Sequence, residues 1–199
     1  MTQALLLAAF PPELAGLDAM PPLGWRVACT GVGALAAAVT TSRLIAELKP
    51  QKVLFIGTCG AYDERLAIGN ILAVSEAFAV SLDELEDRAF RPGIERTRWE
   101  ATWALPFPAH IVAVPPAITK TREGSETLAR VAAAEHLEVT GVFAACHEAG
   151  IPVAAALAVA NRVGPTAHAE WQAHHAAASA GLVEALRRIL FEAVPPPAE

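Results

Sequence analysis

Short, continuous apolar runs alternate with longer segments of helix-forming residues along this chain. Apolar runs without polar alternation are typical of strands that are buried on both faces of a sheet. They predict strands at residues 4–10, 25–29, 53–56, 70–74, 77–80, 110–114 and 153–160. Broad apolar faces predict helices at residues 34–48, 123–134, 142–149 and 167–191. Residues 81–103 are more polar, and we expect them to form a loop or variable segment.

This alternation predicts an α/β fold in which helices cover both faces of a sheet. No repeat or linker divides the chain, so residues 1–194 are expected to form one domain and the Pro-rich residues 195–199 a frayed tail. In such folds ligands bind beyond the carboxyl ends of the strands. The residues that follow the predicted strands are therefore the first candidates for functional residues.

Composition narrows the class of protein. Of the 199 residues, 54% are hydrophobic and 18% are charged, which is enough apolar material for an ordered core and excludes a disordered chain. The longest charge-free run, residues 101–119, contains four prolines and is not expected to span a membrane. A net charge of −6 argues against non-specific binding to nucleic acid. The N-terminus lacks the basic segment of a signal peptide, so we expect a cytoplasmic protein.

The cysteine and histidine positions do not predict a metal site or a redox cofactor. Cys29, Cys59 and Cys146 have no metal-type spacing, and their odd number favours free thiols over a disulfide framework. His174 and His175 are adjacent on a predicted helix, where neighbours do not share a face, so we expect them at the surface.

Three candidate groups follow predicted strands. Glu13 could be a carboxylate at a cleft edge, desolvated and able to act as acid or base, or a first-turn carboxylate that stabilises a helix. Small residues at 57–61 make room for a ligand or pack as a turn, and Cys59 there is expected to be a buried hydrophobe rather than a nucleophile. Asn161 either faces a ligand or caps its own turn.

A glycine turn at residues 30–33 joins a predicted strand to a predicted helix. Its backbone amides could approach an anion or a ribose, or the glycines could simply make a tight turn. The next strand ends in Gly57-Thr58, without an acidic residue to hold a ribose hydroxyl, so a dinucleotide site is not expected.

The order and spacing of several segments resemble the purine-type nucleoside phosphorylase and nucleosidase superfamily. The resembling segments are residues 8–14, 30–33, 55–61, 68–71, 137–141 and 159–164. The last of them, with Pro165 and Trp171 after it, is most similar to futalosine hydrolases of menaquinone synthesis, and methylthioadenosine/S-adenosylhomocysteine nucleosidases are next. The resemblance implies a three-layer α/β/α fold with a mostly parallel mixed sheet, a small-molecule nucleoside as the partner, and a homo-oligomer.

The resemblance also implies a reaction. Such enzymes break a ribose N-glycosidic bond through an oxocarbenium-like transition state, which needs help for the leaving base and a water or phosphate on the opposite side of the sugar. Glu13 falls on the water-activating glutamate, and Asn161 falls where many members carry the aspartate that protonates the purine. The remaining matched positions are Thr58, Cys59 and Gly60 near the water or phosphate, and Glu138, Val139 and Thr140 in the ribose segment.

Three departures from the family pattern keep alternatives open. Val139-Thr140 stands where members usually carry Met-Glu, Leu157 stands where many nucleosidases have an arginine, and Asn161 can donate a hydrogen bond but is not a proton-transferring acid. The leading expectation is a nucleosidase acting on a futalosine-like or methylthioadenosine-like substrate. The alternatives are a phosphate-dependent phosphorylase, for which Arg43 and Arg65 are the cations considered, and a catalytically degenerate nucleoside-binding protein.

Overall fold

Eight strands form one curved sheet in the computed structural model, which describes residues 4–191. The strands are β1 (Ala4–Ala8), β2 (Trp25–Cys29), β3 (Val53–Ala61), β4 (Ile71–Ala79), β5 (Arg98–Glu100), β6 (Ala109–Val114), β7 (Ala134–Glu135) and β8 (Val153–Arg162). The α-helices are α1 (Ala34–Leu48), α2 (Leu82–Leu85), α3 (Arg122–Leu128), α4 (Val139–Glu148) and α5 (Ala167–Leu186). A 3₁₀ turn, η1 (Pro11–Leu14), follows β1, and a π-helical turn, η2 (Arg187–Phe191), follows α5.

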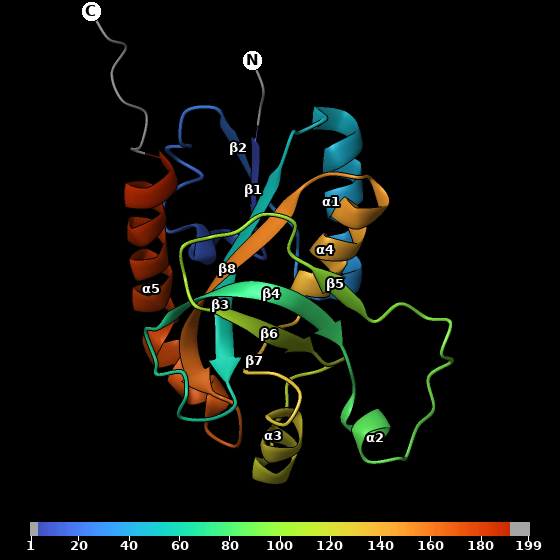
Figure 1. Ribbon diagram of the computed structural model, residues 1–199. Helices are drawn as coiled ribbons and strands as arrows, with labels where there is room; N and C mark the ends of the chain where they lie inside the picture. The colour runs from blue at the N-terminus through green and yellow to red at the C-terminus, as the bar shows by residue number, and fades with distance from the viewer. Residues whose placement is uncertain (1–3, 192–199) are drawn as a thin grey trace, which may run out of the picture.

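Helices cover both faces of the sheet, as predicted. Figure 1 shows α5 on one side of the sheet and α1 with α4 on the other. One apolar core lies under α1 and α4, and a second lies under α5. Parallel pairs outnumber antiparallel pairs, and the result is the expected three-layer α/β/α fold with a mostly parallel mixed sheet.

Several elements differ from their predicted extents. One strand, β4, replaces the two predicted at 70–74 and 77–80, because a bulge between Val74 and Glu76 keeps the polar interruption paired with β6. The helix predicted at 123–134 ends at Leu128, and Ala134, the last residue of the predicted helix, begins β7. Within the polar segment 81–103 lie the short α2 and β5. The predicted tail at 195–199 lies outside the described residues.

The sheet curls because two long strands change partners along their length. The first three residues of β3 pair with β1, its last two pair with β7, and β8 runs along its other edge. In turn β8 pairs with β4, β4 with β6, and β6 with β7, which closes a cycle of five strands. This closure brings the carboxyl ends of β3 and β8 together with the short strand β7.

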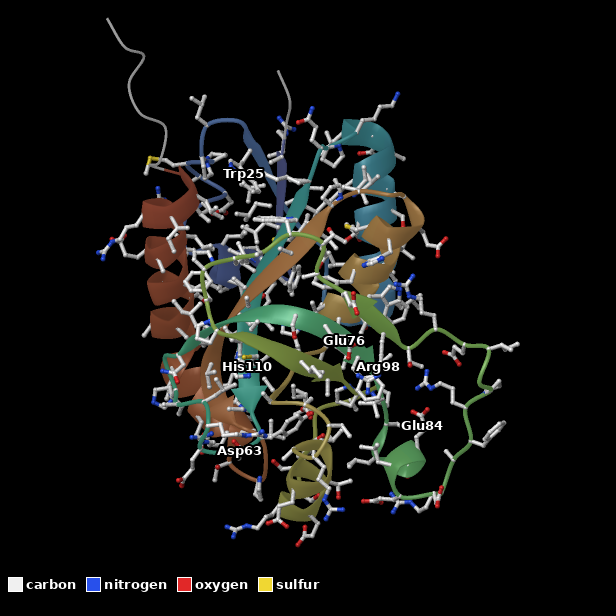
Figure 2. All side chains as sticks on the ribbon, in the orientation of Figure 1. Trp25, Asp63, Glu76, Glu84, Arg98 and His110 are labelled. Carbon is white, nitrogen blue, oxygen red and sulfur yellow. The ribbon has the colours of Figure 1, made fainter. Side chains whose placement is uncertain are left out.

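Close contacts hold the outer elements in place. Gly141 lets α4 pack directly on α1, because an added Cβ would lie 2.0 Å from the carbonyl oxygen of Ala34. At the sheet edge, Arg98 of β5 pairs with Glu76 of β4, and Figure 2 shows the two side chains close together. The Arg98 guanidinium also lies 3.5 Å from the centre of the Phe78 ring. Among residues 4–191, no helix is both long enough and apolar enough to cross a membrane.

Candidate functional site

A cavity of about 440 Å³ opens where β1, β3, β7 and β8 end. Its polar lining residues are Glu13, Thr58, Glu135, His136, Glu138, Asn161 and His168. Its larger apolar and aromatic walls come from Phe10, Val32, Ile118, Leu137, Val163 and Trp171. Most of the lining is apolar, and a few polar side chains converge on it, as is usual for a small-molecule site.

Glu13 is the most deeply anchored carboxylate of this cavity. Pro11 and Pro12 start the 3₁₀ turn that places it beside the end of β3, and the residue is only 3% exposed. Its Oε1 accepts hydrogen bonds from the backbone N–H and the hydroxyl of Thr58, both at 2.8 Å, and its Oε2 accepts one from Ala9 N at 3.2 Å. Counting lone pairs leaves one acceptor position free on Oε2.

The environment of Glu13 raises its pKa above the usual value of 4.5. Burial is the largest cause, since it penalises the charged form. The nearby His136 and the hydrogen bonds from Thr58 lower the pKa in part, and the Glu138 carboxylate raises it. A carboxylate with a raised pKa that keeps a free lone pair can accept a proton near neutral pH.

Asn161 lies across the end of the sheet from Glu135, with Gly60 between them. Gly60 pairs with Glu135 on β7 and with Asn161 on β8, so the three residues form a row across neighbouring strands. A Cβ on Gly60 would lie 2.9 Å from Asn161 Nδ2 and 2.8 Å from Val163 Cγ2. The missing side chain therefore makes room for the Asn161 amide. That amide donates one hydrogen bond to the Arg162 carbonyl, and its Oδ1 and second N–H keep the capacity to bind a ligand.

Glu138 precedes α4 and reaches the glycine turn before α1. Its Oε1 accepts a hydrogen bond of 2.6 Å from Gly33 N, so the turn at 30–33 serves to hold a carboxylate. His136 Nδ1 accepts from the backbone N–H groups of Glu138 and Val139, at 3.1 and 3.3 Å. The same Nδ1 lies 3.2 Å from Glu138 Oε2.

Sequence reasoning missed Glu135 and His136. Glu135 accepts hydrogen bonds from Thr119 N at 2.9 Å and from the Tyr62 hydroxyl at 3.2 Å, and burial raises its pKa. Both residues directly follow the helix predicted at 123–134, whose last residue, Ala134, belongs to β7 instead. Two acidic positions close together, Glu135 and Glu138, were the available signal, but a two-residue strand shows no periodicity of its own.

Six of the eight predicted site residues lie around the cavity: Glu13, Thr58, Cys59, Gly60, Glu138 and Asn161. Val139 is fully buried in the core beneath α1 and α4, and Thr140 lines a second cavity of about 640 Å³. The segment expected to hold a ribose therefore faces the first cavity with Leu137-Glu138, an apolar residue followed by a carboxylate. Cys59 is a buried lining residue, and burial together with the Glu13 carboxylate raises the pKa of its thiol.

No lysine or arginine is among the described residues that line the cavity. Arg43 pairs with Glu47 on the exposed face of α1, and Arg65 pairs with Asp63 at the surface. His175, predicted at the surface, is half-buried and stacks on Trp171 with ring centroids 4.2 Å apart. Within the part of the chain that the structure describes, no group of three or more metal-ligating side chains is present.

Comparisons with known proteins agree with this architecture. Residues 25–121 match the sequence model of the phosphorylase superfamily, whereas a search of curated protein sequences finds no match. A futalosine hydrolase mutant of Helicobacter pylori strain 26695 has a TM-score of 0.84 at 18% identity, covering 96% of this chain and 100% of that chain. The 5'-methylthioadenosine/S-adenosylhomocysteine nucleosidase from Helicobacter pylori also scores 0.84 at 18% identity, covering 96% and 99%. That from Neisseria meningitidis scores 0.81 at 14%, covering 96% and 100%. The matches confirm the resemblance to the phosphorylase superfamily that the ordered sequence motifs predicted.

Proposed function

We propose that this protein is a nucleosidase that hydrolyses the N-glycosidic bond of a purine-type nucleoside, with Glu13 as the general base. The observation that carries the proposal is the state of Glu13, a buried carboxylate with one oxygen fully engaged and a free acceptor on the other. It lines the same cavity as Asn161, the last residue but one of strand β8. The fold shared with nucleosidases that bind nucleoside analogues supports the same conclusion.

The cavity suits a dissociative displacement at the anomeric carbon. A water held by Glu13 Oε2 attacks C1′ and gives its proton to that carboxylate, while the C1′–N bond breaks and its electron pair leaves with the base. Asn161 donates a hydrogen bond to the departing base, which takes its proton from solvent because an amide does not transfer one. The carboxylate of Glu138 then faces the positively charged sugar and stabilises it.

Glu138 also answers the main argument for a degenerate, non-catalytic protein. That argument rested on Thr140, which stands where the family pattern has a glutamate, and on Leu157, which stands where many nucleosidases have an arginine. The residues that line the cavity are Leu137 and Glu138, so a carboxylate is present at the site, held by the Gly33 N–H. Catalysis by this chain does not depend on Thr140.

Hydrolysis is favoured over phosphorolysis by the charge of the cavity. Three carboxylates, from Glu13, Glu135 and Glu138, line it, and no described lysine or arginine does. A phosphate ion would meet negative charge without a compensating cation, whereas water needs none. We therefore infer that base release requires no phosphate.

The walls of the cavity suit a flat base and an apolar 5′ substituent. Phe10, Val163 and Trp171 present aromatic and aliphatic surface, and Asn161 supplies the directional polar contact. We propose a futalosine-like or methylthioadenosine-like substrate, the two classes named for the structural neighbours.

Cys29, Cys59 and Cys146 are free thiols, which suits the cytoplasm as the site of action.

The decisive experiment is incubation with futalosine, methylthioadenosine and inosine in phosphate-free buffer, followed by detection of free base. We expect release from at least one of them, and a loss of at least 100-fold in kcat on Glu13→Gln, since a positioned general base contributes roughly that much. Glu126→Gln, at an exposed carboxylate on α3, is the matched control and should keep full activity.

Each alternative has its own outcome in this assay. Strict dependence on added phosphate would establish a phosphorylase. Saturable binding of a nucleoside without turnover, while a known nucleosidase releases base under the same conditions, would establish a degenerate binding protein. Full activity of the Glu13→Gln variant would remove Glu13 from the mechanism.

A further inference from the structure

The indole of Trp171 is connected to the Glu13 carboxylate through a single hydroxyl group. Trp171 lies near the start of α5, and its Nε1 donates a hydrogen bond of 3.1 Å to Thr58 Oγ1. The same Thr58 oxygen lies 2.8 Å from Glu13 Oε1. A role as an apolar wall of the cavity does not use this N–H.

Hydrogen-bond chemistry sets the direction of the connection. An indole N–H can only donate, so Thr58 Oγ1 is the acceptor in its bond to Trp171. The single proton of the hydroxyl is then left for Glu13 Oε1, which also accepts from the Thr58 backbone N–H. Both acceptor positions of Oε1 are filled in this way, and Oε2, with Ala9 N as its one donor, keeps a free position.

We propose that Trp171 is a positioning residue for the reaction: its N–H holds the Thr58 hydroxyl as a donor to Glu13 Oε1, which leaves Oε2 as the oxygen that receives the proton of the attacking water. The inference rests on the proposed hydrolytic function for its catalytic meaning. The hydrogen-bonded chain itself is a property of the fold and can be tested without turnover.

Neighbouring aromatic rings fix the orientation of the Trp171 indole and therefore the direction of its N–H. His175 stacks on it at a centroid distance of 4.2 Å and an interplanar angle of 13°, and His168 lies nearly parallel to it at 6.2 Å. His168, Trp171 and His175 are three and four residues apart, so they share one face of α5. Phe10, which precedes the turn carrying Glu13, packs at 6.1 Å from the same ring. Rotation of the indole would break these contacts.

Charged and titratable groups surround the hydrogen bonds that connect Trp171, Thr58 and Glu13, and their charges do not depend on the indole N–H. Glu13 is faced by His136 and Glu138 from the segment between β7 and α4, by Cys59 on β3 and by Cys29 on β2. The Trp171 ring is faced by His168 and His175. Removing a neutral donor changes none of these charges. It releases the Thr58 hydroxyl, whose hydrogen bond lowers the pKa of Glu13, so that pKa should rise.

The test is Trp171→Phe, which keeps an aromatic ring and removes the N–H. We expect kcat to fall about tenfold, the effect of releasing the Thr58 hydroxyl from its hydrogen bond to the charged Glu13 carboxylate, with little change in KM. The acid limb of the pH profile of kcat should move to higher pH. Trp103→Phe is the matched control, because Trp103 Nε1 is buried without a hydrogen-bond partner among the described residues. That control should leave both kcat and the pH profile unchanged.

Combination with Thr58→Val separates positioning from packing. If Trp171 acts through the hydroxyl, Trp171→Phe should cost nothing further once that hydroxyl is gone. An equal loss in the two backgrounds would show that the ring contacts the substrate or simply packs, and would overturn the proposal. Thermal unfolding of each variant verifies that it is folded.

A second measurement does not require activity. In protein labelled with ¹³C at the glutamate carboxyl carbons, the Glu13 signal is assigned by its loss in Glu13→Gln and titrated with pH. We expect a higher midpoint in Trp171→Phe and in Thr58→Val, and an unchanged midpoint in Trp103→Phe. An unchanged midpoint in Trp171→Phe overturns the positioning role, whereas the absence of base release by the wild type overturns only the proposed function.

Discussion

At the scale of single residues, the cavity is built around carboxylates that the fold keeps out of water. Glu13 accepts three hydrogen bonds and Glu135 accepts two. Burial nevertheless raises the pKa of both carboxyl groups. Desolvation therefore outweighs the donors that surround them. A buried ionised carboxylate reduces the stability of the folded state, and such a cost is typical of sites arranged for chemistry.

This cost predicts how stability depends on pH. The folded-state pKa of Glu13 lies above its unfolded value of 4.5, so its contribution to stability is complete below pH 4.5 and is lost as the pH rises through the folded pKa. Glu13→Gln cannot ionise and escapes this loss. We expect the Tm of the variant, relative to that of the wild type, to increase as the pH rises from 4 to 8. Glu126→Gln should follow the wild type throughout, and a constant difference between Glu13→Gln and wild type would contradict the prediction.

At the scale of elements, the site depends on how closely α1 approaches α4. Gly33 precedes α1 and Glu138 precedes α4, and the hydrogen bond between them spans the two helix starts. Gly141 makes the approach possible, because its Cα lies against the backbone of Ala34. Helix packing and the placement of a site carboxylate are therefore one structural feature.

Gly141→Ala tests this dependence. Its Cβ would lie 2.0 Å from Ala34 O, so the helices must separate. We expect a loss of about 1–3 kcal/mol in the free energy of unfolding, measured by urea denaturation. The control is Gly181→Ala on α5, where no atom lies within 4 Å of the added Cβ. Since alanine is the better helix former, that change should stabilise the protein by about 0.5–1 kcal/mol. Equal effects of the two substitutions would contradict the packing argument.

At the scale of the whole molecule, several apolar side chains near α1 are exposed. Val32 in the turn before α1 and Leu35 and Val39 on that helix have exposed fractions of 64, 79 and 63%, and Ile118 is 56% exposed. The second cavity opens on the same side, lined by Val32 and Leu35. Exposed apolar side chains beside a cavity suit an interaction site, and we propose that a second copy of this chain covers them, giving a homo-oligomer.

The oligomer prediction is checked by light scattering coupled to size exclusion. The wild type should have a mass of two or more times 20.8 kDa, and Leu35→Glu should lower it, because a charge buried at an interface is costly. Ala176→Glu, at an exposed position on α5, should leave the mass unchanged. A wild-type mass of 20.8 kDa would refute the proposal.

The sequence was sufficient to predict elements whose apolar pattern is local and spans the whole element. The helix predicted at 34–48 and the strand predicted at 25–29 have the observed bounds, since each carries a complete apolar pattern between clear breaks. It also singled out Glu13 and Asn161, because both follow strongly apolar strands. Residues at the ends of buried strands are close together in any sheet of this class.

The tertiary structure alone decided which residues of the ribose segment face the cavity and what surrounds Glu13. A two-residue strand such as β7 has no readable period, so Glu135 and His136 became visible only once β3 and β6 had paired with it. The choice of Leu137-Glu138 over Val139-Thr140 depends on where α4 begins. The bond from Trp171 to Thr58 joins residues 113 positions apart. Local propensity acts over a few residues, whereas these placements arise from packing between distant segments, which no local pattern encodes.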